Sequence, residues 1–562
     1  MKIINFRPKQ KDKSIYSMLK SCTNGSKLDD NKFDELINPT VEGELKISSG
    51  FLDQFGINDK DRSEQVPKIL EVILKIYNDE ILFKDIENEL KNINFKTLNI
   101  IDEVLKKLNN DNYNVHTYET FKKLMYETSD KEVFKFSVEM TGVIGLCEEL
   151  IDDYVLIGQS EEFSKYISFI LCVWRDNPKF LDGLFHLLDN SSNWGSINYA
   201  EMLMDKEDIM SDIKNQRRIL IGALKNNCIP MEIGYYLASS LNIEELCKIS
   251  HGDRNLSEAF VDLYYTLFFE REPSGGILDL DDPLKYINSY LKCVKYSKFK
   301  DINFVGMKNI YRFISDKNNS NEFIEKYNKE TFDLIKNEVE ALWENINTVN
   351  NLKEVINEGT DYIYDLAYYV RENKIKEVIP ELEKIYKEKE EEHPYLEQLL
   401  SELGSDSVKK YIYKELKKEY KNRLKGDKKY SYINLFGDEY KLVQKIQYKI
   451  DILAWEGTKD YDLIGKMLED YNPEIRCKAL KVINKADYYT HNKSIMDKVK
   501  ERLCDGPLYV RKEALKLCKN INFKITSEEK NYILEKIKER EGEESINGED
   551  SFTNNINDIV YF

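Results

Sequence analysis

Two stretches toward the C-terminal end of the chain decide the fold. Residues 463–483 read LIGKMLEDYNPEIRCKALKVI, and residues 499–518 read VKERLCDGPLYVRKEALKLC. When they are aligned on Arg476 and Arg511, five further positions match: Leu468 with Leu503, Asp470 with Asp505, Ile475 with Val510, Ala479 with Ala514, and Leu480 with Leu515. The two arginines are 35 residues apart, which is long enough for two helices and their turns.

Each shared position has a mechanical role in a helical hairpin. The first helix is expected to end near the leucine, and the aspartate with the following proline, Pro473 or Pro507, turns the chain and starts the second helix. The small Ala479 and Ala514 allow close helix approach. Such a hairpin cannot bury its apolar face alone, so the pattern predicts a stack of hairpins.

This pattern resembles the HEAT repeat family, whose second helix commonly begins with an Asp-Pro-x-Val-Arg-x-x-Ala-Leu motif. The resemblance is specific at 463–518 and weaker at 129–188 and 394–404. It implies a right-handed α-solenoid of antiparallel hairpins and an adaptor function. Because residues 200–390 show no echo, a non-repetitive helical bundle or several unrelated helical domains is the alternative.

Helix starts within 129–188 follow from local signals. Ser129 and Glu132 fit a capping box, in which each side chain accepts from the backbone of the other. Asn177 and Pro178 fit a capping residue followed by a proline in the first helical turn.

The composition favours an all-α fold independently of the motif. Only 11 prolines and 24 glycines occur in 562 residues, too few for a turn-rich sheet protein. A chain of this length must form several domains or extend as a repeat array. Its nine cysteines include no C-x-x-C pair and predict buried thiols in a reducing compartment.

The pattern along the chain predicts four regions. Residues 1–62 form an irregular N-terminal cap with a short hairpin, and residues 63–271 and 284–540 form two halves of helical hairpins. The loop EPSGGILDLDDP at 272–283 separates the halves. Residues 541–562 are predicted to form an acidic, disordered tail, whose apolar end from Ile559 to Phe562 is either a frayed terminus or a docking segment for a partner.

The lack of long apolar segments and the negative net charge argue against membrane proteins and against non-specific nucleic-acid binding. The start MKIINFRPKQKDKS has no apolar signal region, and no apolar run reaches the ~20 residues that span a bilayer, so a cytoplasmic protein without membrane contact is expected. Heavy use of Lys, Asn, Ile and Tyr suggests a bacterial source. The formal charge of −18 opposes non-specific adhesion to nucleic acid.

Catalytic signatures are missing from the sequence. It contains no Walker loop, G-x-G-x-x-G, H-E-x-x-H, G-x-S-x-G or EF-hand pattern, so no enzyme activity, cofactor or metal site is expected. Three groups of residues each fit a reactive or metal-binding role and a plainer structural one. Cys247 with His251 suggests a thiolate–imidazolium pair or a helix end, and Asp182 with His186 a metal pair or a surface hydrogen bond. The aspartates of the 272–283 loop suggest cation ligands or helix caps: Asp279, Asp281 and Asp282.

The most distinctive surface pattern lies at 408–432. Apolar residues at four-residue steps predict an amphipathic helix: Val408, Ile412, Leu416, Tyr420 and Leu424. Another face of that helix is basic and includes aromatic residues, which suits phosphates and stacked bases: Lys410, Lys414, Lys417, Lys421, Lys425 and Tyr413. The alternative is a solvated face, or one paired with the acidic run at 388–392.

The leading functional hypothesis is a non-enzymatic scaffold that binds another protein along the surface of the helical array. The second hypothesis is nucleic-acid binding through the basic 408–432 segment. These two predictions differ in the partner and in the surface that each would use.

Overall fold

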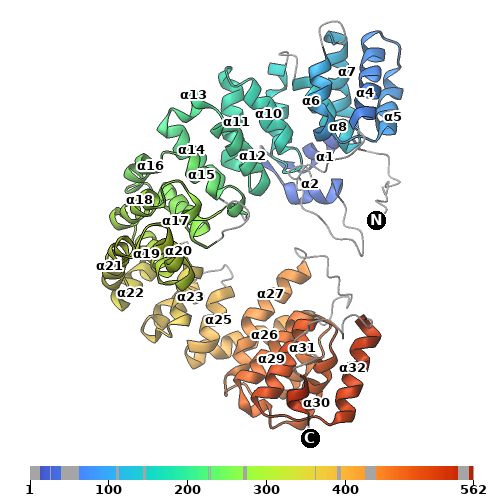
Figure 1. The fold of residues 1–562 in the computed structure, drawn as a ribbon. Helices are drawn as coiled ribbons and strands as arrows, with labels where there is room; N and C mark the ends of the chain where they lie inside the picture. Colours follow the sequence, from blue (N-terminus) through green and yellow to red (C-terminus); the bar gives the residue numbers. More distant parts are fainter. Residues whose placement is uncertain are drawn as a thin grey trace. The chain divides into compact units, whose positions relative to one another are not determined.

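The structure, a computed structural model, describes residues 13–25, 27–38, 62–108, 113–142, 147–225, 227, 229–269, 275–360, 362–388, 394–423, 438–541 and 556–560. These residues are predominantly helical (Figure 1), which confirms the predicted all-α class and its array of helices. The chain divides into two compact units, Met1–Ile346 and Asn347–Phe562. The described part of the 272–283 loop lies inside the first unit.

The first unit begins with a short irregular segment. It comprises α1 (Ile15–Ser21), the strands β1 (Thr23–Asn24) and β2 (Lys27–Leu28), and α2 (Asp30–Ile37). The strands pair antiparallel, with Thr23 opposite Leu28, around Gly25, whose φ of 65° suits glycine. Helix α1 packs against α7 (Val115–Glu127) and α9 (Ile151–Gly158), so this segment covers the side of the array.

The remaining helices of the first unit are α4 (Arg62–Tyr77), α5 (Phe83–Ile93), α6 (Thr97–Lys107), α8 (Lys131–Gly142), α10 (Ser164–Val173), α11 (Pro178–Asn190), α12 (Asn193–Met204), α13 (Glu207–Met210), α14 (Ile213–Leu224), α15 (Gly234–Ser240), α16 (Ile243–Ser250), α17 (Arg254–Phe269), α18 (Pro283–Tyr296), α19 (Lys300–Ser315), α20 (Lys317–Lys326) and α21 (Lys329–Ile346). Short 3₁₀ turns occur at Cys147–Leu150, Pro230–Glu232 and Ile277–Asp279.

These helices form two layers of antiparallel pairs. In one layer α8, α10, α12, α14, α17, α19 and α21 pack each on the next, and in the other α9 packs on α11 and α16 on α18. Successive helices such as α11 and α12, or α18 and α19, also pack on each other. The first unit is therefore a stack of helical hairpins, although its sequence only weakly resembles the motif at 463–518.

The second unit repeats this two-layer plan. Its helices are α22 (Val349–Glu358), α23 (Ile363–Glu372), α24 (Ile379–Glu388), α25 (Pro394–Leu403), α26 (Asp406–Arg423), α27 (Asp438–Ile450), α28 (Tyr461–Leu468), α29 (Pro473–Lys485), α30 (Lys493–Glu501), α31 (Leu508–Asn520) and α32 (Ser527–Glu541). Short 3₁₀ turns occur at Lys376–Val378, Asp451–Ala454, Asp487–Tyr489 and Arg502–Cys504. One layer runs α23, α25, α27, α29, α31, each packed on the next, while α22 packs on α24 and α28 on α30.

Apolar periodicity explains how these helices face the core. In α26 the predicted residues Val408, Ile412, Leu416 and Tyr420 are all buried. Leu424 and Lys425 lie outside the described residues. The helix therefore buries one stripe and exposes its lysines, as its sequence predicts.

The two predicted helix starts had different outcomes. Asn177 caps α11 by accepting from the Lys179 backbone at 3.1 Å, with Pro178 in the first turn, as predicted. The Ser129–Glu132 capping box is wrong, because Asp130 accepts from the backbone nitrogens of Glu132 and Val133. The Glu132 carboxylate instead accepts from the Thr97 backbone of α6 at 2.9 Å.

Part of the expected disordered tail is ordered. A 3₁₀ turn at Ile556–Ile559 packs on α31, and both of its isoleucines are buried. The Ile525 backbone donates to the Ile559 carbonyl at 2.8 Å, and Lys519 forms an ion pair with Asp558. Ile559 thus packs within its own unit, while residues 542–555, 561 and 562 lie outside the described residues.

Across the described ranges, no helix has both the length and the apolar character required to cross a membrane. The cysteine side chains that the structure describes form no disulfides with one another, and all but Cys504 are buried.

Candidate interaction surfaces

A row of tyrosines lies on the solvent side of three helices that pack in sequence in the second unit. Tyr364 of α23 meets Tyr395 of α25 edge to face, with ring centroids 5.2 Å apart, and Tyr395 contacts Tyr448 of α27 at 5.1 Å. Tyr368 lies one helical turn after Tyr364. Tyr364, Tyr368 and Tyr395 are 43%, 46% and 40% exposed. We call these four residues the tyrosine row.

A network of charges fixes the helices that present this row. The Arg371 guanidinium of α23 makes two hydrogen bonds of 3.0 Å to the Glu402 carboxylate of α25. Lys485 of α29 contacts both Glu402, at 3.0 Å, and Asp451, at 3.1 Å, and Lys478 contacts Asp451 at 2.8 Å. Burial alone would raise the pKa of Asp451, but the two lysines hold it below its usual value. The network therefore links α23, α25 and α29 and pre-organises the tyrosine row.

The predicted basic face of α26 is only partly available. Lys410, Lys414 and Lys421 are exposed, and none of them forms an ion pair with any residue in the described part of the chain. Lys417 instead contacts the carboxylate of Asp460, which caps α28, at 3.1 Å.

The predicted stacking aromatic of this face is also engaged. The Tyr413 hydroxyl donates to Asp460 at 2.6 Å, and Lys417 lies over the Tyr413 ring. Burial, followed by the hydrogen bond to Asp460, raises the pKa of Tyr413. The structure thus brings Lys417 and Tyr413 together as a contact between α26 and α28, and leaves three lysines of the face exposed.

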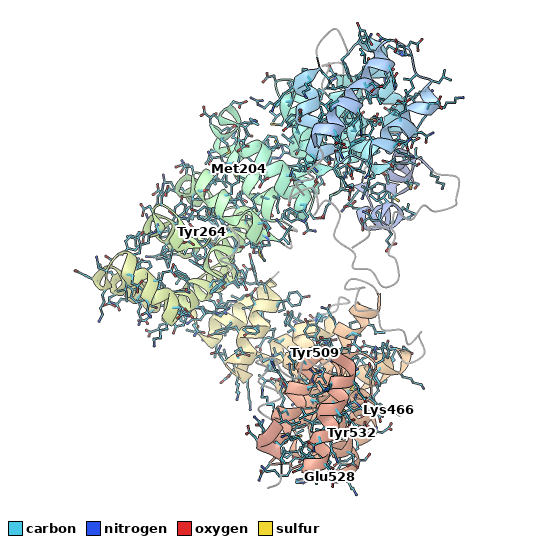
Figure 2. The ribbon with its side chains drawn as sticks, turned by 45° about the vertical axis from the view of Figure 1, so that its right-hand side comes forward. Met204, Tyr264, Lys466, Tyr509, Glu528 and Tyr532 are labelled. Atoms are coloured by element: carbon cyan, nitrogen blue, oxygen red, sulfur yellow. The ribbon has the colours of Figure 1, made fainter. Side chains whose placement is uncertain are left out.

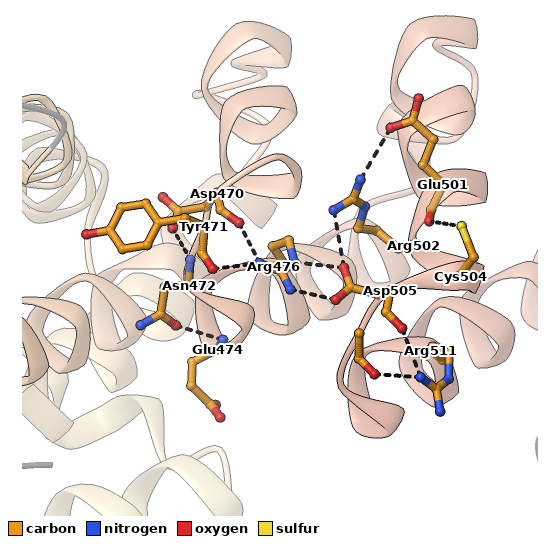
Figure 3. A network of polar contacts seen from close by, with 11 residues as sticks. Asp470, Tyr471, Asn472, Glu474, Arg476, Glu501, Arg502, Cys504, Asp505 and Arg511 are labelled. Carbon is orange, nitrogen blue, oxygen red and sulfur yellow. Dashed lines mark hydrogen bonds and ion pairs between the residues drawn. The ribbon is translucent and has the colours of Figure 1, made fainter. Parts of the chain in front are cut away.

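The residues that defined the repeat form a ladder of buried polar contacts, drawn in Figure 3. The Arg476 guanidinium binds the Asp505 carboxylate of the next hairpin through two hydrogen bonds, 2.8 Å from Nε and 2.5 Å from Nη2. Its Nη1 donates to the Asp470 and Tyr471 carbonyls of its own turn, at 2.6 and 2.9 Å. Arg511 repeats the second part of this pattern, donating to the Asp505 and Gly506 carbonyls.

The ladder extends backward to α26. Asp470 accepts from the Arg423 guanidinium and from the Tyr420 hydroxyl, the latter at 2.9 Å, and Asp470 and Arg423 are both buried. The other Asp470 oxygen accepts from the Asn472 backbone at 2.8 Å and so shapes the turn. Each aspartate therefore joins the preceding hairpin to its own turn.

The remaining repeat positions have the expected local roles. Helix α28 ends at Leu468, and α29 begins at Pro473, capped by Asn472. In the next repeat Pro507 is itself the capping residue of α31. Ala479 and Ala514 are completely buried where α29 packs on α31.

None of these three groups of residues assembles the reactive or metal-binding arrangement considered for it in the described part of the chain. Cys247 hydrogen-bonds toward α18 rather than toward His251, which caps the C-terminal end of α16 and packs at a tilt against Tyr296. Asp282 caps α18, and Asp279 accepts from the Gly276 backbone at 2.7 Å. Neither these aspartates nor Asp182 with His186 belong to a metal-binding cluster, because no group of three His, Cys, Asp or Glu side chains suited to a metal occurs in the described ranges.

The tyrosine row is the feature that sequence reasoning missed. Tyr364 and Tyr395 are 31 residues apart, whereas Tyr395 and Tyr448 are 53 apart, so no single period joins them. The available signal was the pair Tyr364 and Tyr368, which places two aromatic rings on one helical face beside the buried residues of α23.

Together, the fold and these surfaces define a class: helical-hairpin arrays stacked in two layers. Comparisons with known proteins do not assign the chain to a particular family within this class. No protein family matches the sequence, and no curated protein matches it. Among solved structures, the chain is similar to an engineered protein from the Northeast Structural Genomics Consortium, at 12% identity over 97% of each chain and a TM-score of 0.22. That score is too low to support an argument about fold or function.

Proposed function

We propose that this protein is a non-enzymatic scaffold that binds another protein through the tyrosine row of its second unit. We further propose that the array is HEAT-like, on the strength of the motif at 463–518 and its Arg–Asp ladder. The observation on which the functional proposal rests is the contact between the exposed rings of Tyr364 and Tyr395 on two neighbouring helices, continued by the contact of Tyr395 with Tyr448. This contact adds a specific binding surface to the scaffold hypothesis that the sequence suggested.

Exposing the aromatic rings of the tyrosine row to water costs free energy. Solvent-facing helix positions are ordinarily polar, yet α23 and α25 place adjoining aromatic rings there. Tyrosine is enriched at protein interfaces, because its rigid ring buries a large area at low entropic cost and its hydroxyl can still hydrogen-bond. Since the Arg371–Glu402 contact fixes the underlying helices, little ordering is required on binding.

The proposal is tested by quantitative capture from the native host. The intact protein and a Tyr364→Ser/Tyr368→Ser/Tyr395→Ser variant serve as baits, with Tyr532→Ser as a matched control. Tyr532 is exposed on α32, outside the tyrosine row, and is labelled in Figure 2. We expect a stoichiometric protein partner that the triple variant loses and the control retains. Truncating central interface tyrosines typically costs about 2 kcal/mol or more each, roughly thirtyfold in affinity.

Two results would contradict this proposal. One is the absence of any stoichiometric protein partner for the intact protein. The other is equal capture by the triple variant, which would move the binding surface elsewhere on the array.

A second candidate function is phosphate contact with nucleic acid through α26. It is favoured by the exposed Lys410, Lys414 and Lys421, and by the charge distribution along the chain. Residues 347–562 contain 39 Lys and Arg against 42 Asp and Glu, whereas residues 1–346 contain 44 against 59. The acidity that opposes nucleic acid is therefore concentrated in the first unit.

A low-salt mobility-shift assay tests this candidate. Lys410→Glu/Lys414→Glu/Lys421→Glu reverses these three exposed charges but leaves the Lys417–Asp460 contact intact. The control Lys106→Glu/Lys214→Glu/Lys317→Glu makes the same charge change at exposed lysines of the first unit. We expect binding to be lost only in the α26 variant. No binding by the intact protein, or equal loss in both variants, rejects this site.

A further inference from the structure

Two buried thiols meet between neighbouring hairpins of the first unit. Cys247 lies on α16 and Cys293 on α18, two helices that pack on each other. The Cys247 thiol lies 2.9 Å from the Ser289 carbonyl, to which it donates, and the Cys293 sulfur lies 3.2 Å from the Ser250 hydroxyl. Ser250 lies one helical turn after Cys247, and Ser289 lies one turn before Cys293, so each sulfur contacts a residue one turn away from the other cysteine.

The surroundings of the pair differ between the two sulfurs. The hydrogen bond from Cys293 lowers the pKa of Cys247, and the positive charges of Lys292 and Lys248 act in the same direction. Cys293 has its pKa raised well above the usual value, because it donates toward Cys247 and is deeply buried. Of the two sulfurs, Cys247 therefore has the lower pKa and is the better candidate for the nucleophile.

The neighbouring residues keep the two helices in place. Tyr264 of α17, labelled in Figure 2, stacks on Tyr290 of α18 at 4.2 Å and donates to the Tyr286 carbonyl at 2.8 Å. Ser250 donates to the Cys247 carbonyl, and the Ser257 hydroxyl donates to the Ser250 carbonyl, which ties α16 to α17. Both thiols are therefore held in a packed interior between α16 and α18.

We propose that Cys247 and Cys293 form an oxidisable dithiol that a small peroxide converts to an intrachain disulfide. The Cys247 thiolate attacks one oxygen of hydrogen peroxide; the O–O bond breaks and the leaving hydroxide takes up a proton to become water. The Cys293 sulfur then attacks the resulting sulfenic acid. The S–S bond forms, the S–O bond breaks, and the second oxygen leaves as water with the Cys293 proton.

The balance is two thiols and one peroxide giving one disulfide and two waters. Peroxide gains the two electrons that the sulfurs lose. The product covalently joins α16 to α18, and therefore links two consecutive hairpins of the array. Because both sulfurs are buried, the site takes a small peroxide and excludes bulky thiol reagents from the folded protein.

The test treats the full chain with a modest excess of hydrogen peroxide, followed by alkylation in denaturant and peptide mass spectrometry. We expect the intact mass to fall by about 2 Da and a peptide pair joining Cys247 to Cys293, both reversed by dithiothreitol. In the folded, untreated protein neither thiol should react with a bulky aromatic disulfide reagent.

Variants separate this site from other cysteines. Cys247→Ser and Cys293→Ser should each abolish the mass loss, while Cys172→Ser should retain it. Cys172 is a suitable control because it is buried and its thiol donates to the Met202 carbonyl, not to another cysteine or a serine hydroxyl. Peptide mass spectrometry of the disulfide in the protein without substitutions gives a result even if a variant fails to fold. Recovery of Cys247 and Cys293 as alkylated thiols while Cys504 is oxidised would overturn the proposal.

Discussion

Arg476 and Asp505 form a two-point contact between successive hairpins, with Nε and Nη2 of the guanidinium 2.8 and 2.5 Å from the two carboxylate oxygens. Both side chains are largely buried, and the third nitrogen of Arg476 satisfies carbonyls of its own turn. One side chain thus closes a turn and binds the next repeat. Arg502 adds a further contact to Asp505 at 3.2 Å, so this carboxylate is shared by two cations.

Asp505→Ala should destabilise the second unit strongly. The substitution leaves Arg476 buried without its carboxylate, and breaking a buried ion pair in this way typically costs about 3–5 kcal/mol. Hydrogen exchange of the α29 and α31 peptides measures the local free energy of opening directly. The matched control is Asp462→Ala, whose exposed contact to Lys466 lies within one helix and should contribute less than about 1 kcal/mol. Equal protection in the two variants would show that the ladder contributes no stability.

Glu139→Gln should weaken the pH dependence of the first unit. Burial, with a smaller effect of Asp102, raises the pKa of Glu139 from 4.5 to about 8. The unfolded chain releases this proton near pH 4.5, whereas the folded chain retains it to about pH 8. Stability therefore falls as pH rises through that window, by up to about 1.4 kcal/mol per pH unit.

The neutral glutamine is free of this loss, so the variant should gain stability over the intact protein at pH 8 relative to pH 5. Urea unfolding at pH 5 and pH 8 measures the difference in the free energy of unfolding between the variant and the intact protein. The control is Glu103→Gln, at an exposed position. Asp30 and Glu161, whose pKa values burial raises to about 6 and about 7, keep some of the same dependence in every variant. The prediction would be contradicted if the stability difference between Glu139→Gln and the intact protein were the same at both pH values.

Gly158→Ala should destabilise the packing of α9. A Cβ at this position would lie 2.7 Å from Leu187 Cδ1, 2.8 Å from Ile167 Cγ2 and 2.7 Å from the Tyr199 hydroxyl. That hydroxyl donates to the Gly158 carbonyl, so its displacement also removes a buried hydrogen bond. Overpacking of this kind costs about 1–3 kcal/mol. Thermal unfolding should separate this variant from Gly506→Ala, where a Cβ meets nothing within 4 Å.

Ile559→Ala should loosen the end of the second unit. Its side chain is buried beside α31, and removing a buried isoleucine side chain costs about 2–5 kcal/mol. Increased hydrogen exchange at 521–526 would report the loss of the Ile525–Ile559 backbone contact. Asp558→Asn, which affects only an exposed ion pair with Lys519, should change exchange little by comparison.

The sequence was most informative where local signals and packing agree. At 463–518 it predicted that the first helix ends near Leu468, that the second starts at Pro473 and that Ala479 allows close helix approach, because turn chemistry and apolar spacing act over a few residues. It also predicted the buried stripe of α26. The 129–132 start was misassigned, since Glu132 is drawn to the Thr97 backbone, a contact 35 residues away.

The surfaces were harder to predict because they are assembled from separate hairpins. The basic spacing of α26 is visible in the sequence, but its neutralisation at Lys417 depends on Asp460, 43 residues later. The tyrosine row likewise depends on the unequal lengths of the hairpins that place Tyr395 between Tyr364 and Tyr448. Pairing between distant residues is a property of the folded array, and no local pattern encodes it.

The ladder at Asp470 and Asp505 has a consequence for how the second unit comes apart. Each rung couples only adjacent hairpins, so cooperativity passes from neighbour to neighbour as in a one-dimensional chain. If one of these Arg–Asp contacts is lost, we expect the second unit to unfold in two smaller transitions and not in a single cooperative one. The helices from α30 onward would open as a separate group, while those before the broken rung keep their protection from exchange.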